Sequence, residues 1–99
     1  MATTPEGKVK ALIKRHMATF SRKYGFWPVQ TGMGSKTLDS LWCINGRFVA
    51  IEAKAPGKWY TPLQEEHAQQ IRKAGGFVYL VDGPHSLEIA IRQIGLLCL

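Results

Sequence analysis

The chain has 99 residues, enough for one domain with a modest core, and we expect residues 1–99 to form a single domain. No run reaches the roughly 18 consecutive apolar residues of a membrane span, and the N-terminus lacks the basic and then apolar layout of a secretory signal. We therefore expect an intracellular protein. The 13 Lys and Arg against 7 Asp and Glu give a net charge of +6, which favours a polyanionic partner.

The first predicted element is a helix that starts at Thr4-Pro5-Glu6. Thr4 supplies a capping hydroxyl, proline is favoured in the first helical position, and an acid is favoured in the first turn. Apolar residues at helical spacing predict one buried stripe, and we expect this helix to end near Tyr24-Gly25. Residues 26–30 form a short strand candidate, and Gly32-Met33-Gly34-Ser35 predicts a flexible turn.

A β-hairpin is predicted next. Residues 38–44 and 47–54 are two β-type runs around Asn45-Gly46, a strong signal for a two-residue turn. Such a turn fixes the register, so that Asp39 faces Glu52 with Cβ atoms roughly 4.5–5.5 Å apart. Because side chains alternate along a strand, Lys54 lies on the same face as Glu52.

The remaining elements are two helices separated by a strand. Thr61-Pro62-Leu63-Gln64 opens a helix that Gly75-Gly76 closes, residues 77–81 form an apolar strand, and residues 84–94 form a last helix. The order α-β-β-β-α-β-α predicts an α/β fold with a small mixed central sheet flanked by helices.

Two facing carboxylates are the main chemical feature of the sequence. Like charges directly opposite each other destabilise a sheet unless a proton or a cation relieves them. Mg²⁺ or Mn²⁺ prefers carboxylate and water oxygens, and phosphate supplies further oxygen ligands. We therefore expect Asp39 and Glu52 to bind such a metal, with Lys54 placed to orient a water or to stabilise charge on a phosphate.

The alternative is a solvated polar face on which Asp39, Glu52 and Lys54 form only ion pairs, since exposed pairs are common and contribute little. The apolar neighbours favour the functional interpretation, because they indicate a central and buried strand in which an unneeded charge would be costly. These neighbours are Val49, Ala50, Ile51 and Ala53.

Together these motifs resemble a known family. Asp39 followed by Glu52-Ala53-Lys54 resembles the PD-(D/E)XK nuclease signature, and the fuller pattern resembles its VRR-NUC (virus-type replication-repair nuclease) branch. The resemblance covers roughly residues 4–81. The sequence departs from the family pattern in one place, because Leu38 and not proline precedes Asp39. The resemblance rests on the following ordered set: Glu6, Gly34-Ser35-Lys36-Thr37-Leu38-Asp39, Ile51-Glu52-Ala53-Lys54 and Thr61-Pro62-Leu63-Gln64.

The resemblance implies a restriction-endonuclease-like core and assigns roles to its residues. Asp39, Glu52 and the carbonyl of Ala53 would bind metal, and Lys54 would be the catalytic lysine. Glu6 and Gln64 would reach the same site from two helices. Each has an alternative, because Glu6 also suits the helix dipole and Gln64 completes a capping box with Thr61.

Several residues are candidates for nucleic-acid contacts. The glycine-rich turn with Ser35 and Lys36 could cradle phosphate through its backbone, although it lacks the spacing of a P-loop. Lys36 and Lys58 are candidate phosphate contacts or ordinary solvated lysines. The neighbouring aromatics Trp59 and Tyr60 flank the predicted site, where they either stack on an unpaired base or pack in the core.

The resemblance implies a Mg²⁺- or Mn²⁺-dependent DNA endonuclease. We expect it to act on branched or four-way junction DNA in phage or mobile-element replication and repair, in a bacterial or phage-infected cell. Resolution of a four-way junction needs two symmetric nicks, which favours a homodimer with one active site in each subunit. The apolar segment 94–99 either forms the dimer interface or packs into the core of its own chain. The rival functions are a catalytically silent nucleic-acid-binding module of the same fold and a structural domain with an incidental basic surface.

Overall fold

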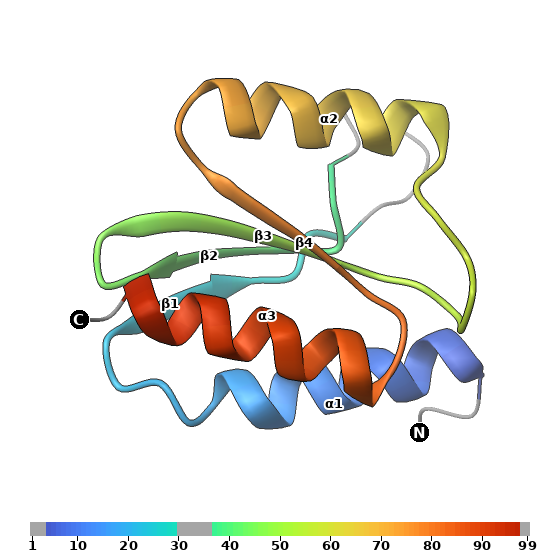
Figure 1. The fold of residues 1–99 in the computed structure, drawn as a ribbon, viewed down its shortest axis with the longest axis horizontal. Helices are drawn as coiled ribbons and strands as arrows, with labels where there is room; N and C mark the ends of the chain where they lie inside the picture. The colour runs from blue at the N-terminus through green and yellow to red at the C-terminus, as the bar shows by residue number, and fades with distance from the viewer. Residues whose placement is uncertain (1–3, 30–36, 98–99) are drawn as a thin grey trace.

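A computed structural model of the chain describes residues 4–29 and 37–97 (Figure 1). Its elements follow the order α-β-β-β-α-β-α, as the sequence predicts. They are α1 (Pro5–Met17), β1 (Lys23–Phe26), β2 (Ser40–Ile44), β3 (Arg47–Ala53), α2 (Pro62–Lys73), β4 (Phe77–Val81) and α3 (Pro84–Leu97).

The four strands form one mixed sheet with the order β1-β2-β3-β4. The first two pairings are antiparallel, whereas β3 and β4 are parallel and are joined through α2. Figure 1 shows α1 and α3 together on one face of the sheet and α2 on the other. The central strand β3 is therefore covered on both faces, and its residues 49–53 are all buried.

The hairpin register is confirmed. Ile44 pairs with Arg47, and the pairing continues in step to Ser40 and Ile51. Asn45 and Gly46 both have positive φ, at 50° and 82°, as a two-residue turn of this kind requires. The turn chemistry thus sets which residues meet at the far end of the hairpin, where Asp39 and Glu52 lie.

The helix starts are also as predicted. Thr4 Oγ1 accepts a hydrogen bond from the Gly7 N–H at 2.9 Å, with Pro5 as the first helical residue. Thr61 and Gln64 form a complete capping box at the start of α2. These caps satisfy N–H groups that have no partner inside the helix.

The predicted end of α1 and the predicted first strand are both wrong. The helix ends at Met17 rather than near Tyr24-Gly25, because the Thr19 hydroxyl donates to the His16 carbonyl at 2.6 Å and the Phe20 N–H donates to Met17. The strand occupies Lys23–Phe26 rather than residues 26–30, of which Gln30 lies outside the described residues. Pro28 has no N–H to donate to a sheet.

Gly25 on β1 allows Trp42 on β2 to pack against the strand. A Cβ atom at Gly25 would lie 2.2 Å from Cζ3 of the Trp42 ring, so only glycine leaves room for the indole. Trp42 is buried, and Trp27 meets it edge-on with ring centroids 6.4 Å apart. Trp42 therefore belongs to the packed face of the sheet.

The core has two parts, one on each face of the sheet. The larger part lies under α1 and α3 and includes Ile13, Met17, Val49, Ile51 and Ile94. The smaller part lies under α2 and consists of Leu38, Ala50, Ala68 and Val78, with Tyr60 packed against it. None of the helices among the described residues is long and apolar enough to cross a membrane.

Candidate active site

Asp39 and Glu52 lie together at the open end of the β2–β3 hairpin. The Asp39 N–H donates to Oε1 of Glu52 at 3.0 Å, and the Ala53 N–H donates to Oδ2 of Asp39 at 2.9 Å. Each carboxylate thus accepts a backbone N–H from the opposite strand. The predicted meeting of the two acids is confirmed, and both are anchored by the ends of the strands.

Glu52 is an acid on a central, covered strand, and the whole residue is only 2% exposed. Burial, and then the charge of Asp39, raise the pKa of the Glu52 carboxyl from 4.5 to about 7, against the opposing effects of the Asp39 N–H and Lys54. Near neutral pH this acid exchanges its proton readily. A cation that replaces the proton would relieve the same repulsion.

Lys54 extends the acidic pair with a positive charge that is largely covered by the protein. Its Nζ lies 3.8 Å from Oε2 of Glu52, and its side chain is only 12% exposed. Its backbone N–H donates to the Val81 carbonyl at 2.9 Å, which continues the parallel pairing of β3 with β4. The lysine is therefore held beside Glu52 by the central sheet and not by a free loop.

Gln64 has both roles that the sequence left open. Its Oε1 accepts the Thr61 N–H at 2.9 Å and so completes the capping box of α2. Its Nε2 donates to Oε2 of Glu52 at 3.0 Å. One side chain therefore caps the helix and fixes the orientation of the buried acid.

Within the described part of the chain, Glu6 is connected to the acidic pair through Lys10. The carboxylate of Glu6 is partly exposed and lies 3.5 Å from Lys10 Nζ, which lies in turn 3.8 Å from Oδ1 of Asp39. Lys10 is a site residue that the sequence analysis missed. Its spacing of four residues from Glu6 was the available signal, but the contact with Asp39 joins α1 to the start of β2 and depends on the tertiary fold.

The available oxygen donors fit a hard divalent cation. They are the carboxylates of Asp39 and Glu52, to which the resemblance adds the carbonyl of Ala53. Among the described residues, no cluster of three or more His, Cys, Asp or Glu is arranged so that it could hold a metal ion. Two carboxylates with one carbonyl are suited to Mg²⁺ or Mn²⁺, which retains waters and takes further oxygens from phosphate. A buried acid with a raised pKa beside a second carboxylate is the feature that such an ion would stabilise.

The remaining candidates lie around this centre or outside the described residues. Lys58 is exposed in the loop 54–61 between β3 and α2, and Trp59 and Tyr60 follow it. Ser35 and Lys36, with the glycine-rich turn, lie outside the described residues, so their predicted phosphate contacts stay predictions.

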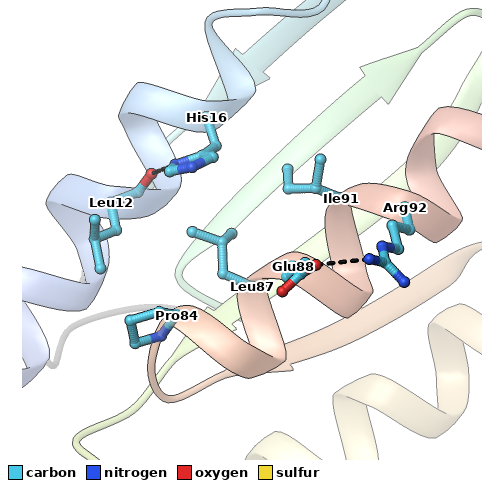
Figure 2. Close-up of a pocket in the computed structure, with 7 residues that line it drawn as sticks. All are labelled: Leu12, His16, Pro84, Leu87, Glu88, Ile91 and Arg92. Carbon is cyan, nitrogen blue, oxygen red and sulfur yellow. Dashed lines mark hydrogen bonds and ion pairs between the residues drawn. The ribbon is translucent and has the colours of Figure 1, made fainter.

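The cleft in Figure 2 is separate from these groups. It has a volume of about 310 Å³ and lies between α1 and α3, lined by Leu12, His16, Pro84, Leu87, Glu88, Ile91 and Arg92. Its charged residues Glu88 and Arg92 pair with each other at 2.7 Å, and His16 Nδ1 is engaged by the Leu12 carbonyl. The carboxylates are therefore the stronger candidate site, because burial and charge coincide there.

Comparison with protein-family models and with curated proteins finds no match to this chain.

Proposed function

We propose that the protein is a metal-dependent deoxyribonuclease of the PD-(D/E)XK type, similar to the VRR-NUC branch. The observation that supports this most is the position of Asp39, Glu52 and Lys54 at the end of one hairpin, with Asp39 beside the buried Glu52 and the lysine on the other oxygen of Glu52. A protein gains nothing in stability from a buried acid that is repelled by a second acid beside it. The cost is understandable if the acids bind a cation for catalysis.

The residues divide the work of phosphodiester hydrolysis. Asp39, Glu52 and the Ala53 carbonyl would hold Mg²⁺ or Mn²⁺, which when bound polarises the phosphoryl group and lowers the pKa of a bound water. Lys54 is placed to orient the attacking water or to stabilise negative charge that develops on the phosphate. Gln64 holds the Glu52 carboxylate in position through its amide.

The basic composition fits DNA as the substrate. The net charge is +6, which favours binding to the phosphate backbone of DNA. The partly exposed Lys10 contacts Asp39, and the exposed Lys58 lies in the loop 54–61 that follows Glu52. We propose branched or four-way junction DNA in a bacterial or phage-infected cell as the natural target. The chemistry of the site itself does not depend on that choice.

A homodimer is part of this proposal, because resolution of a four-way junction needs two symmetric nicks. The C-terminal segment offers less surface than expected: α3 runs to Leu97, Ile94 is buried in the core, and Leu96 is exposed, while Cys98 and Leu99 lie outside the described residues. The exposed aromatics Tyr24, Phe26 and Phe48 form a second apolar area around a hollow of about 440 Å³.

Light scattering at micromolar concentration should give twice the monomer mass of 11.1 kDa.

The test of the proposed activity is a cleavage panel with Mg²⁺ or Mn²⁺. Linear, flapped, forked and four-way DNA of matched sequence are incubated with the wild type and with Asp39→Asn. We expect cleavage of branched DNA by the wild type, none in EDTA, and none by the variant. Salt-sensitive DNA binding without cleavage would instead indicate a catalytically silent binding module.

A further inference from the structure

Trp59 is a large aromatic side chain left in solvent. Of the three tryptophans, Trp42 is buried, Trp27 is half-buried, and Trp59 is 69% exposed. It lies in the loop 54–61, which Figure 1 shows as the yellow-green connection from the end of β3 to the start of α2. Packing in the core, which is the usual role of tryptophan, does not explain its position.

The Trp59 ring is held in a fixed orientation by its neighbour. The Tyr60 ring meets it edge-on, with centroids 5.3 Å apart and planes at 75°. Tyr60 is half-buried and packs against the core under α2, which includes Leu38 and Ala50. An exposed indole supported in this way loses little conformational freedom when it binds a flat partner.

The loop that carries Trp59 is anchored to the sheet. Gly57 has a φ of +80°, and its N–H donates to Oδ2 of Asp82 at 3.1 Å. The Ser86 hydroxyl donates to the other oxygen of Asp82 at 2.8 Å. The Lys58 N–H closes a turn with the Ala55 carbonyl at 3.0 Å. The position of Trp59 relative to the end of β3 is therefore set by backbone and side-chain hydrogen bonds.

Trp59 lies on the loop that connects the end of β3, where Glu52 stands, to Gln64 at the start of α2. It lies two residues before Thr61, so their Cα atoms are at most about 8 Å apart. The Thr61 N–H donates to Gln64, whose amide donates to Glu52. Burial raises the pKa of the Tyr60 phenol, Arg72 opposes this effect, and the Glu52 charge raises the pKa further, as expected for a ring near the site.

We infer that Trp59 stacks on an unpaired nucleobase of the DNA strand that the Asp39–Glu52 site cleaves. The protein would then recognise DNA that has an unpaired nucleotide beside the scissile phosphate. This inference rests on the proposed function. An indole face accepts any base, so the contact gives no sequence preference. In a continuous duplex both faces of each base are covered by neighbouring bases, whereas flaps, gaps and junctions expose them. Lys58 beside Trp59 is placed to contact the adjoining phosphate.

Binding without cleavage tests the stacking contact directly. The wild type, Trp59→Ala and Trp59→Phe are titrated in EDTA with a labelled duplex that carries a short unpaired segment, and with the fully paired duplex. Trp59→Ala should bind the first DNA about tenfold more weakly, the loss expected for one base–aromatic stack, and Trp59→Phe should lose less. Both variants should bind the paired duplex as the wild type does.

Two controls locate the contact. Ile89→Ala removes an exposed apolar side chain, 46% exposed, from α3, and it should bind both DNAs normally. An abasic analogue at the unpaired nucleotide should weaken binding by the wild type as much as Trp59→Ala does, and should have no further effect on that variant. Equal binding by the wild type and Trp59→Ala, or no effect of the abasic analogue, would overturn the inference.

Cleavage in Mn²⁺ separates this inference from the proposed activity. Asp39-dependent cleavage with the same substrate preference in Trp59→Ala would leave the nuclease proposal standing and overturn the stacking contact. Conversely, loss of binding in Trp59→Ala without cleavage of any DNA by the wild type would support the base contact and overturn the nuclease. The two claims therefore fail on different measurements.

Discussion

The amide of Gln64 joins the start of α2 to the buried acid of β3. Its Nε2 donates to Oε2 of Glu52 at 3.0 Å, while its Oε1 accepts the Thr61 N–H. A side chain that has both jobs couples the stability of the helix to the orientation of a buried carboxylate. The two contributions can be separated because Thr61 takes part in the cap but does not contact Glu52.

Thr61→Ala and Gln64→Ala should therefore differ in activity but not in their effect on the cap. Each should lower the free energy of unfolding by about 1 kcal/mol, because each removes half of the capping box. Thr61→Ala should keep a near-normal cleavage rate, whereas Gln64→Ala should lose about tenfold, the usual effect of removing a partner of a metal ligand. Melting temperature and rate are measured on the same samples. Equal rates in the two variants would show that the bond to Glu52 has no role in catalysis.

The raised pKa of Glu52, about 7 against 4.5, predicts how the stability of the metal-free protein depends on pH. The folded chain holds this proton more tightly than the unfolded chain does, so the free energy of unfolding is highest below the unfolded pKa and falls as the pH rises to about 7. The loss should be of the order of 2–3 kcal/mol between pH 5 and pH 8.

Glu52→Gln supplies the matched control for this pH effect, because glutamine has the same shape and does not titrate. Denaturant unfolding in EDTA should show a steeper loss of stability with pH for the wild type than for Glu52→Gln. Mg²⁺ should restore the stability of the wild type at pH 8, since a bound cation replaces the proton. Parallel pH profiles for the two proteins would contradict the raised pKa.

Glu6 and Lys10 provide a test of how the first helix contributes to the site. Glu6 contacts Lys10 at 3.5 Å, and Lys10 contacts Asp39 at 3.8 Å. If Glu6 acts through Lys10, Glu6→Gln should slow cleavage by less than about fivefold, and this effect should disappear in the Lys10→Gln background. Single-turnover rates of the two single variants and the double variant measure the coupling. Additive losses would instead indicate that Glu6 contacts the metal or the DNA independently.

Gly25→Ala should be strongly destabilising. The new Cβ would lie 2.2 Å from the Trp42 ring, which is packed against Trp27 and the core, and overpacking of this kind costs about 1–3 kcal/mol. Gly95→Ala is the control, because among the described residues nothing beyond its own helix backbone and chain neighbours lies within 4 Å of its Cβ position, and α3 continues through it. This control should gain about 0.5–1 kcal/mol. Urea unfolding of both variants and the wild type checks the two signs, and an unchanged stability of Gly25→Ala would contradict the packing of β1 on Trp42.

The features that the sequence predicted well are those fixed by local chemistry. Asn45-Gly46 defines a turn, the turn defines the register, and the register brings Asp39 to Glu52. Thr61 and Gln64 define a cap in the same way. In each case the interacting groups are close in sequence or are joined by a hairpin whose geometry has few alternatives.

The features that could not be predicted from the sequence depend on tertiary contacts. The position of β1 is set by its pairing with β2 and by the fit of Trp42 over Gly25, and neither leaves a periodic pattern in residues 23–30. Lys10 reaches Asp39 only because α1 packs under the sheet. The exposure of Trp59 likewise follows from the anchoring of its loop by Asp82, which lies 25 residues beyond Gly57.

The single-turnover rate of branched-DNA cleavage in Mn²⁺, compared between the wild type and Glu52→Gln, tests the central claim most directly. Both proteins should fold, because the substitution keeps the shape of the side chain and removes a buried charge. The wild type should cleave in Mn²⁺ and not in EDTA, and Glu52→Gln should be slower by about 100-fold or more, because it loses a carboxylate ligand of the metal. Equal rates for the two proteins, cleavage that persists in EDTA, or no cleavage of any DNA by the wild type would contradict the assignment of Asp39, Glu52 and Lys54 as a metal-dependent nuclease site.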